Sequence, residues 1–525
     1  MRDGVTLRVN VFRPEGGGGH PVIMSAHPYG KDRIAARSRS GRRLDFQYRL
    51  FPQPDPIAFS DLTGWEAPDP AVWVTRGYAV INADLRGSGT SDGIGELFSV
   101  KEAEDYHDLI EWAGVQPWSN GRVGLDGVSY LAISQLGAAA QRPPHLAAIC
   151  PWEGVSDLYR DFARPGGVRE DGFSKLFSAM TSRTSRVQTT LRPQVVAHTE
   201  RDAWWKARTP CLERIEVPLL VCGRFSDHSL HTRGSFEVFR RAGSSRKWLY
   251  THRGGKWSTY YGEDATRTRI RFFDHVLKGL DNGWADRPAV RLAIHDQGPT
   301  PVAVTDEESW PPHDVAWRSL WLDAASRTLS SRKPEGAASV AFRAPREGVS
   351  FMWDVPEDVD VIGPMVLRLH LELRDGDDAF LFAGIRKFRR GAEVTFEGSF
   401  GFAADMVSKG WQRAAHRVLD DRLSTPGQPV HTHERAERLR PGEIVPVLIA
   451  LRPHATRFLK GDRLQVDVRG RWHYPRDPLR GQFPAFYERS PNARCVLHTG
   501  GAHEAQLLLA SRPIAVTAAK VDRAR

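Results

Sequence analysis

One serine has the sequence context of a catalytic nucleophile. Ser129 lies in the stretch VGLDGVSYLA, residues 123–132, where an apolar run ends at a glycine and a segment rich in Ala, Gln and Leu follows. This order predicts a strand, a sharp turn and a helix, with the serine hydroxyl exposed at the turn. Gly127 suits such a turn, because the strand and helix backbones crowd together beside the serine. Since G-x-S occurs by chance in many chains, the assignment depends on whether the sequence also supplies catalytic partners.

A base and an acid are needed, because serine is a poor nucleophile until a base takes its proton and a carboxylate orients that base. Asp227 follows a predicted strand at 217–222, and His252 follows another at 247–251. Ser, Asp and His therefore occur in an order that is typical of one class of hydrolases, each after a strand. The expected catalytic triad is Ser129, Asp227 and His252.

Two hydrogen-bond donors must also face the oxyanion that forms during acyl transfer. One is expected to be the backbone N–H of Tyr130, directly after the serine. The other is expected from the loop after the predicted strand 21–26, where the phenol of Tyr29 is the natural candidate. No metal or cofactor is expected, because the scattered His and Cys residues form no ligand set.

The elements that position these residues fall into two regions. In the first, buried strands alternate with helices, which predicts a mostly parallel sheet covered on both faces. A helical, arginine-rich segment interrupts that alternation and predicts an inserted cap. In the second region, alternating strands separated by turns predict an all-β sandwich with jelly-roll connections. The expected boundaries are 1–154 and 213–288 for the α/β domain, 155–212 for the cap and 289–525 for the sandwich.

Composition narrows the classes of function. The 525 residues have a formal charge of +10 that comes mostly from dispersed arginines, so no nucleic-acid partner is expected. Four scattered cysteines are typical of free thiols in a reducing compartment. No run reaches the roughly 18 apolar residues of a membrane span, and no apolar leader precedes the first predicted strand. We expect a cytoplasmic protein that acts on a small molecule or peptide away from membranes, with a homo-oligomer left open.

Several short motifs occur in order along almost the whole chain: MRDGV at 1–5, HPYGK at 27–31, DLRGSG at 84–89, QPWSNG at 116–121, GVSYL at 127–131, and GW at 410–411 with HR at 416–417. With them the chain resembles the Xaa-Pro dipeptidyl-peptidase and cocaine-esterase family of α/β-hydrolases, which includes α-amino-acid ester hydrolases and cephalosporin acylases. The resemblance implies an α/β-hydrolase fold with a helical cap and a C-terminal jelly-roll domain. It also implies Ser129 as nucleophile, Asp227 as orienting acid, and Tyr29 with the Tyr130 amide as oxyanion hole.

The chain departs from the family pattern at two positions. Ala132 stands where the family usually has glycine, and one extra methyl group should be tolerated. The family places its histidine in a G-P-W-x-H segment, where this chain has Lys256 if the strand end is matched or Thr259 if the tryptophan is matched. His252 stays the preferred base, because a lysine of ordinary pKa is protonated at neutral pH and threonine is no base. The alternatives are His228 and His231.

The leading prediction is a serine hydrolase that cleaves an ester or amide bond of a small molecule or short peptide through an acyl-enzyme. An Xaa-Pro dipeptidyl-peptidase is an alternative, and it needs an acidic anchor for the substrate's free amino group, for which Glu153, Asp157 and Asp161 are candidates. A catalytically inactive protein that binds a ligand with its β-sandwich is an alternative of another class. The substrate depends on a pocket formed jointly by the loop 33–73, the cap and the β-domain.

Overall fold

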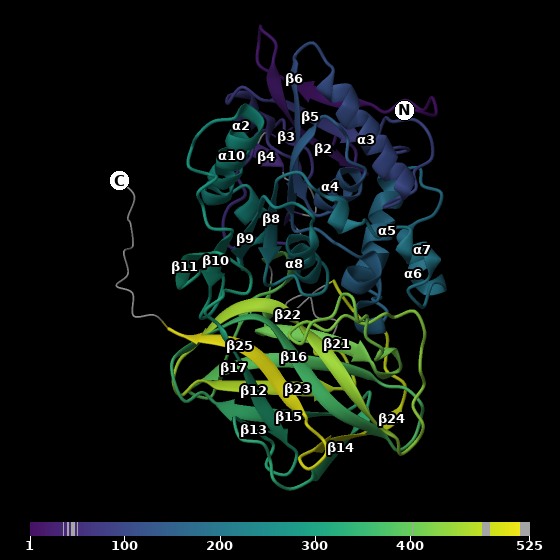
Figure 1. Cartoon of the computed structure of the whole chain (residues 1–525). Coiled ribbons are helices and arrows are strands. Elements are labelled where there is room, and N and C mark those ends of the chain that lie inside the picture. The colour runs from purple at the N-terminus through teal and green to yellow at the C-terminus, as the bar shows by residue number, and fades with distance from the viewer. Residues whose placement is uncertain are drawn as a thin grey trace.

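The computed structural model describes residues 1–34, 36–38, 41–43, 48–49, 51–401, 403–474 and 484–514. Figure 1 shows an α/β domain stacked on a domain of strands, with α8 near the boundary between them. The fold class is the expected one: an α/β-hydrolase domain with an inserted helical cap, followed by an all-β domain.

A sheet of nine strands, counted over the described residues, forms the centre of the first domain, in the order β1-β5-β2-β6-β7-β8-β9-β10-β11. The edge strands β1 and β11 are antiparallel to their neighbours, and the strands between them run parallel. Helices cover both faces, and the inner strands are correspondingly buried along most of their length. The bounds are β1 Val9–Phe12, β2 His20–His27, β5 Ala79–Asp84, β6 Ser119–Val128, β7 Leu146–Trp152, β8 Leu219–Arg224, β9 Lys247–His252, β10 Val290–Ile294 and β11 Ala303–Glu307.

The helices of this domain lie on either side of the sheet. Figure 1 shows α3 and α4 on one side and α2 and α10 on the other. Their bounds are α2 Pro70–Val74, α3 Val100–Gly114, α4 Tyr130–Ala140, α8 Thr232–Arg241, α9 Lys256–Tyr260 and α10 Glu263–Lys278, and a small hairpin joins β3 Ala36–Ser38 to β4 Gly41–Arg43. Helix α3 begins after Ser99, whose hydroxyl accepts a hydrogen bond from the Glu102 N–H at 3.1 Å and so caps the helix.

The segment between β7 and β8 is helical throughout its described elements, as expected for the cap. It contains a π-helix Leu158–Ala163, α5 Phe173–Thr184, α6 Leu191–Ala197, α7 Ala203–Lys206 and short 3₁₀ turns at Pro165–Gly167 and Leu212–Arg214. The sequence assigned Val290–Ile294 to the sandwich, but this strand, β10, pairs in parallel with β9. The first sheet therefore extends to β11, beyond the expected boundary at residue 289.

The second domain is a β-structure around its own hydrophobic core. Its longest strands, β16 and β22, pair in antiparallel register over most of their length. The bounds are β12 Ala316–Asp323, β13 Thr328–Ser330, β14 Ala338–Ala344, β15 Gly348–Asp354, β16 Val359–Leu373, β17 Phe380–Arg389, β18 Ala392–Val394, β19 Phe396–Glu397, β20 Ala404–Asp405, β21 Ser408–Arg413, β22 Ile444–Phe458, β23 Arg463–Arg469, β24 Ala493–Thr499 and β25 Gln506–Pro513, with 3₁₀ turns at Ser399–Gly401 and Ala414–His416.

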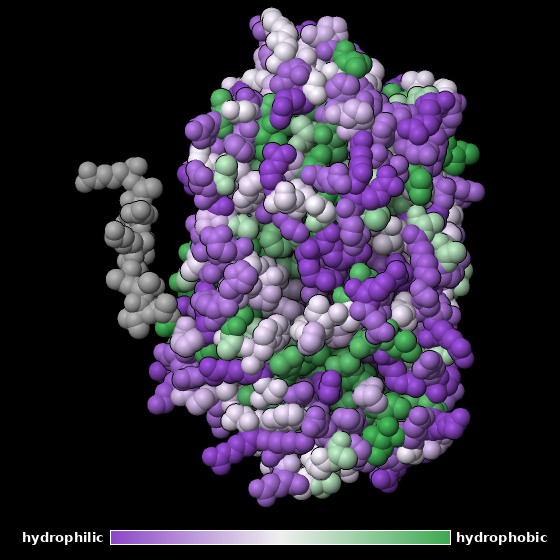
Figure 2. All heavy atoms as spheres, viewed as in Figure 1, coloured by the Kyte–Doolittle hydropathy of each residue, from purple (hydrophilic) through white to green (hydrophobic). Residues whose placement is uncertain are grey.

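The visible face of the molecule is mainly hydrophilic, and hydrophobic residues gather below the boundary between the two domains in Figure 2. Within the residues described, we find no helix with both the length and the apolar character needed to cross a bilayer.

Candidate active site

Ser129 occupies a strained turn between β6 and α4. Its φ of 62° and ψ of −115° are unusual for a residue with a side chain, and they hold the hydroxyl at the carboxyl end of the sheet. Gly127 has a φ of 145°, and a Cβ atom there would lie 2.5 Å from the Cβ of Leu131. The glycine is therefore required by the close approach of the strand to the helix, as the sequence predicted.

The residue that contacts the serine is His231. Its Nε2 lies 3.1 Å from the Oγ of Ser129. His231 directly precedes α8, and the backbone carbonyl of Asp227 accepts hydrogen bonds from the N–H groups of Leu230, His231 and Thr232 at 3.1–3.2 Å. This tight turn, which follows β8, orients the imidazole toward the serine. A base within hydrogen-bond distance of the nucleophile is the geometry that acyl transfer requires.

Asp227 and Ser129 both approach the Nε2 atom of His231. Asp227 Oδ2 is 3.9 Å from this Nε2, which is too long for a hydrogen bond. Its Oδ1 accepts a hydrogen bond from the hydroxyl of Ser399 at 2.7 Å. Because Ser399 follows β19, the second domain contributes directly to the position of this carboxylate.

His252, the base preferred from the sequence, is directed elsewhere. Its Nε2 lies 3.3 Å from Glu153 Oε1, and its ring packs against Trp152 with centroids 6.2 Å apart. It is the last residue of β9, so its side chain direction is fixed by the strand. His228 is turned toward the second domain, where its Nδ1 lies 3.5 Å from Asp405 Oδ2. Of the three candidate histidines, the structure brings only His231 to the serine.

A lysine and a glutamate lie beside this histidine. The Nζ of Lys256 is 3.2 Å from His231 Nε2 and 3.5 Å from Glu66 Oε1, and all three side chains are buried. The indole N–H of Trp257 donates to the same Glu66 oxygen at 2.7 Å. Lys256 is the residue that replaces the family histidine when strand ends are matched. Sequence reasoning missed Glu66, which lies in an irregular segment without any motif.

Burial governs the protonation of these groups. Desolvation, followed by the neighbouring Lys256 cation, lowers the pKa of His231 well below its usual range. The imidazole is consequently neutral and able to accept a proton. Burial raises the pKa of Asp227, and Lys256 opposes that shift. Burial likewise raises the pKa of Glu66, against the effects of Lys256 and Trp257.

Both expected oxyanion donors lie beside the serine. Tyr29 follows β2, lines the same pocket as Ser129, and packs edge-on against Tyr130 with ring centroids 6.0 Å apart. Burial and then Glu66 raise the pKa of Tyr29 well above its usual value, so the phenol retains its proton. Tyr130 is the first residue of α4, where the N–H has no acceptor within the helix. Its hydroxyl donates to Glu102 at 2.6 Å, which anchors the start of the helix.

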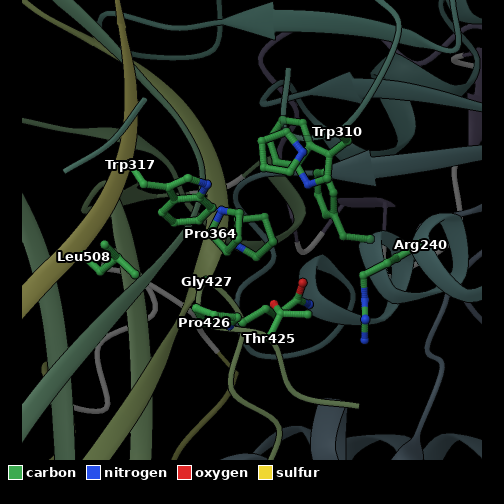
Figure 3. A pocket seen from close by; sticks show the side chains of 12 residues that line it. Arg240, Trp310, Trp317, Pro364, Thr425, Pro426, Gly427 and Leu508 are labelled. Atoms are coloured by element: carbon green, nitrogen blue, oxygen red, sulfur yellow. The ribbon is translucent and has the colours of Figure 1, made fainter. Parts of the chain in front are cut away.

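Three parts of the chain form the walls of the pocket above Ser129, as the sequence predicted. Phe51 and Trp65 come from the loop after β4, Phe173 and Met180 from cap helix α5, and Phe400 from the second domain. A larger cavity of about 570 Å³, shown in Figure 3, opens between α8 and the second domain and is lined by Trp310, Trp317 and Pro364 among others. It includes none of the candidate catalytic residues.

The acidic anchors proposed for a peptidase face other partners. Glu153 contacts His252, Asp157 binds Arg160 at 2.9 Å, and Asp161 binds Arg233 at 2.5 Å. None of these carboxylates lines the pocket that contains Ser129. Across the described ranges, no group of three or more His, Cys, Asp and Glu side chains is arranged to hold a metal ion.

Comparison with known proteins places this geometry in context. Residues 3–190 match the X-Pro dipeptidyl-peptidase (S15 family), and residues 282–508 match the X-Pro dipeptidyl-peptidase C-terminal non-catalytic domain. A solved CocE/NonD family hydrolase from Staphylococcus aureus is 36% identical and superposes with a TM-score of 0.91. The comparison covers 98% of this chain and 92% of the hydrolase. The cocaine esterase of Rhodococcus sp. is 26% identical over 430 residues, which cover 70% of this chain and 68% of the esterase. An α-amino acid ester hydrolase has the same fold, with a TM-score of 0.71 and 16% identity over 98% of this chain and 95% of that one.

Proposed function

Because this chain belongs to the CocE/NonD family of hydrolases, we propose that it cleaves a carboxylic ester or amide through an acyl-enzyme on Ser129, with His231 as the base. The contact of 3.1 Å between Ser129 Oγ and His231 Nε2 at the strained turn is the observation that carries the proposal. Other members of the family hydrolyse esters or peptides, and the serine hydrolase chemistry is common to both.

The reaction begins when His231 Nε2 takes the hydroxyl proton as Ser129 Oγ attacks the carbonyl carbon. The resulting oxyanion receives hydrogen bonds from the Tyr29 phenol and the Tyr130 N–H. Collapse of this intermediate breaks the bond to the alcohol or amine, which leaves with the proton from His231. Water then attacks the acyl-enzyme and gives a proton to His231. As the bond between the acyl group and Ser129 Oγ breaks, His231 returns this proton to Oγ and the acid is released.

Charges of opposite sign adjust the basicity of His231. Lys256, at 3.2 Å, disfavours the imidazolium that forms during the reaction, whereas Glu153 and, from 3.9 Å, Asp227 favour it. Lys256 is itself held by Glu66 at 3.5 Å. In this assignment Lys256 is a positioning and electrostatic group, and the proton passes between Ser129 and His231.

The lining of the pocket favours an apolar acyl group over the charged amino terminus of a dipeptide. Its walls are mostly aromatic and aliphatic, and the one carboxylate among its lining residues, Glu66, is occupied by Lys256 and Trp257. A free amino group would have to displace the lysine to reach that carboxylate. The sequence candidates for such an anchor bind other residues, which favours ester or acyl-amide substrates over Xaa-Pro peptides.

The test is the activity of wild type and Ser129→Ala on p-nitrophenyl acetate, butyrate and benzoate, combined with labelling by a fluorophosphonate probe. We expect the wild type to be labelled on Ser129 and to turn over aryl esters, and Ser129→Ala to lose both properties with an unchanged circular dichroism spectrum. A folded wild type that is neither labelled nor active would instead support an inactive binding protein. Faster turnover of proline dipeptide amides than of aryl esters would support the peptidase.

A further inference from the structure

A small cationic cavity lies where the cap, α8 and the second domain meet. Its volume is about 30 Å³, and its lining includes Arg160 of the π-helix, Arg233 of α8, Trp411 of β21 and Arg452 of β22. Gly166 completes the wall on the cap side, and a Cβ atom there would lie 1.8 Å from the carbonyl oxygen of Trp411. The two domains are therefore in close contact around the cavity.

The carboxylates nearby neutralise only part of the charge. Asp157 Oδ2 lies 2.9 Å from Arg160 Nη1 and 2.9 Å from Arg201 Nε, so one carboxylate pairs with two guanidinium groups. Arg233 is paired with Asp161 at 2.5 Å and lies 4.0 Å from Glu237, a carboxylate that also binds Arg240 at 2.8 Å. The remaining acid near Arg160 is Asp420, whose Oδ2 is 3.9 Å from Nη2.

Arg452 has no carboxylate within ion-pair distance in the described parts of the chain, although it is only 6% exposed. Its Nε donates to the carbonyl of His228 at 2.9 Å, and its guanidinium lies over the Trp411 ring, 4.8 Å from the centroid. Burial, and then the Arg233 cation, lower the pKa of Arg452 to about 10, so the group remains charged at neutral pH. Asp161 acts on this cation only at longer range, and a buried charge without a carboxylate in direct contact is costly.

A second observation is a buried donor without a partner on a residue of the cavity wall. The indole N–H of Trp411 is buried and has no hydrogen-bond partner among the described residues. Indole and guanidinium groups are donors only. The histidine His431 on the wall gives no extra charge, because burial lowers its pKa to about 3, and its carbonyl already accepts from Arg160. A water molecule would satisfy a donor without balancing the charge.

We propose that this cavity binds a small monovalent inorganic anion, of the size and charge of chloride, between Arg452, Arg160, Arg233 and the Trp411 N–H. The volume sets the size, because a single water needs about 10–15 Å³ of such space and larger oxyanions need several times more. The anion neutralises Arg452 and accepts a hydrogen bond from the Trp411 N–H, which has no other partner among the described residues. Anion binding in this cavity is independent of which residue acts as the catalytic base.

The site has a consequence for the fold around the active site. His228, whose carbonyl accepts from Arg452, lies in the turn that runs from Asp227 to His231. An anion that fixes Arg452 therefore links the cap, this turn and the second domain. We expect bound chloride to raise the midpoint of thermal unfolding, because a ligand that binds only the folded state stabilises it in proportion to the logarithm of its concentration above Kd.

The experiment measures thermal unfolding of the full chain in sodium chloride against sodium gluconate at constant ionic strength. We expect a saturable rise in Tm with chloride for wild type, and for Arg463→Gln, a control whose exposed arginine lies on the same domain. For Arg452→Gln, the chloride concentration that gives half of the rise in Tm should be at least about tenfold higher. The reason is that a hydrogen bond to a charged group contributes about that factor to affinity. Trp411→Phe, which keeps an aromatic ring and removes the indole N–H, gives the same comparison if Arg452→Gln does not fold.

A bromide-soaked crystal of the wild type locates the ion through its anomalous signal. A peak among Arg160, Arg233 and Arg452, together with a chloride response that the variants weaken, supports the proposal. An empty cavity at high bromide overturns it, as does a chloride response that is the same in the variants and in wild type. A bromide peak without any chloride effect on Tm identifies an adventitious ion only and also overturns it.

Discussion

Replacement of Lys256 by methionine separates two possible roles of this lysine. If it acts through its charge on His231, Lys256→Met should remain active, and the acidic limb of its pH profile of kcat/KM should move to higher pH. The sign follows from the protonation of the base. Only neutral His231 accepts the serine proton, and the Lys256 cation lowers the pKa of this histidine. Loss of the cation raises that pKa, so activity falls sooner as the pH decreases.

The separation of 3.2 Å between Lys256 Nζ and His231 Nε2 sets the size of the shift. Two unit charges at that distance interact by about 5 kcal/mol at an effective dielectric constant of about 20, and by about 1.3 kcal/mol at about 80. These energies correspond to about 4 and about 1 pKa units. Glu66, which lies 3.5 Å from the lysine, offsets part of its charge, so we expect a rise nearer to one unit.

The assay is the dependence of kcat/KM on pH for an aryl ester, which reports the pKa of the base in the free enzyme. Lys256→Arg preserves the cation and should keep the acidic limb at low pH. The double variant Lys256→Met/Glu66→Gln also removes the charge of the glutamate that has lost its lysine partner, and it should retain the upward shift. Complete loss of activity in both Lys256→Met and Lys256→Arg, with a native fold, would refute the reasoning and assign the base to the lysine.

Three further predictions concern the same site. His231→Gln should lower kcat by about 10²–10⁴-fold, whereas His252→Gln should change it little, and the opposite ranking in steady-state assays would restore His252 as the base. Tyr29→Phe should lower kcat by about 10²–10³-fold through the loss of an oxyanion donor, with little change in KM, and an unaltered kcat would exclude that role. Gly127→Ala should lower the free energy of unfolding by about 1–3 kcal/mol, because the new methyl group meets Leu131 at a positive φ, and urea denaturation measures this loss.

The fold and the serine were predictable because their signals are local. A strand, a glycine and a serine before a helix describe the turn at Ser129 completely, and the alternation of buried strands with helices indicates a parallel sheet. The same local reasoning extended the β-sandwich too far toward the N-terminus. Val290–Ile294 was grouped with the sandwich strands, yet four of its five residues are buried and it pairs with β9. Strand pairing is a long-range property.

The base was harder to choose because three histidines follow strand ends within a short stretch of chain. His231 differs from the other two histidines in the path of the backbone that leads to it. The carbonyl of Asp227 accepts hydrogen bonds from three N–H groups and so closes a tight turn. No residue type in that turn specifies this path. Glu66 was unpredictable for a related reason, since its contact with Lys256 joins segments about 190 positions apart.

Ser399 donates a hydrogen bond to Asp227, and Phe400 lines the pocket, so the two domains form the active site jointly. They are therefore expected to evolve together. A chimaera that combined this catalytic domain with the β-domain of a relative would exchange part of the pocket wall and the donor that fixes the carboxylate. Substrate preference in such a protein would follow the grafted domain as well as the serine. Laboratory evolution of a new specificity can therefore place its mutations in a domain that carries neither the nucleophile nor the base.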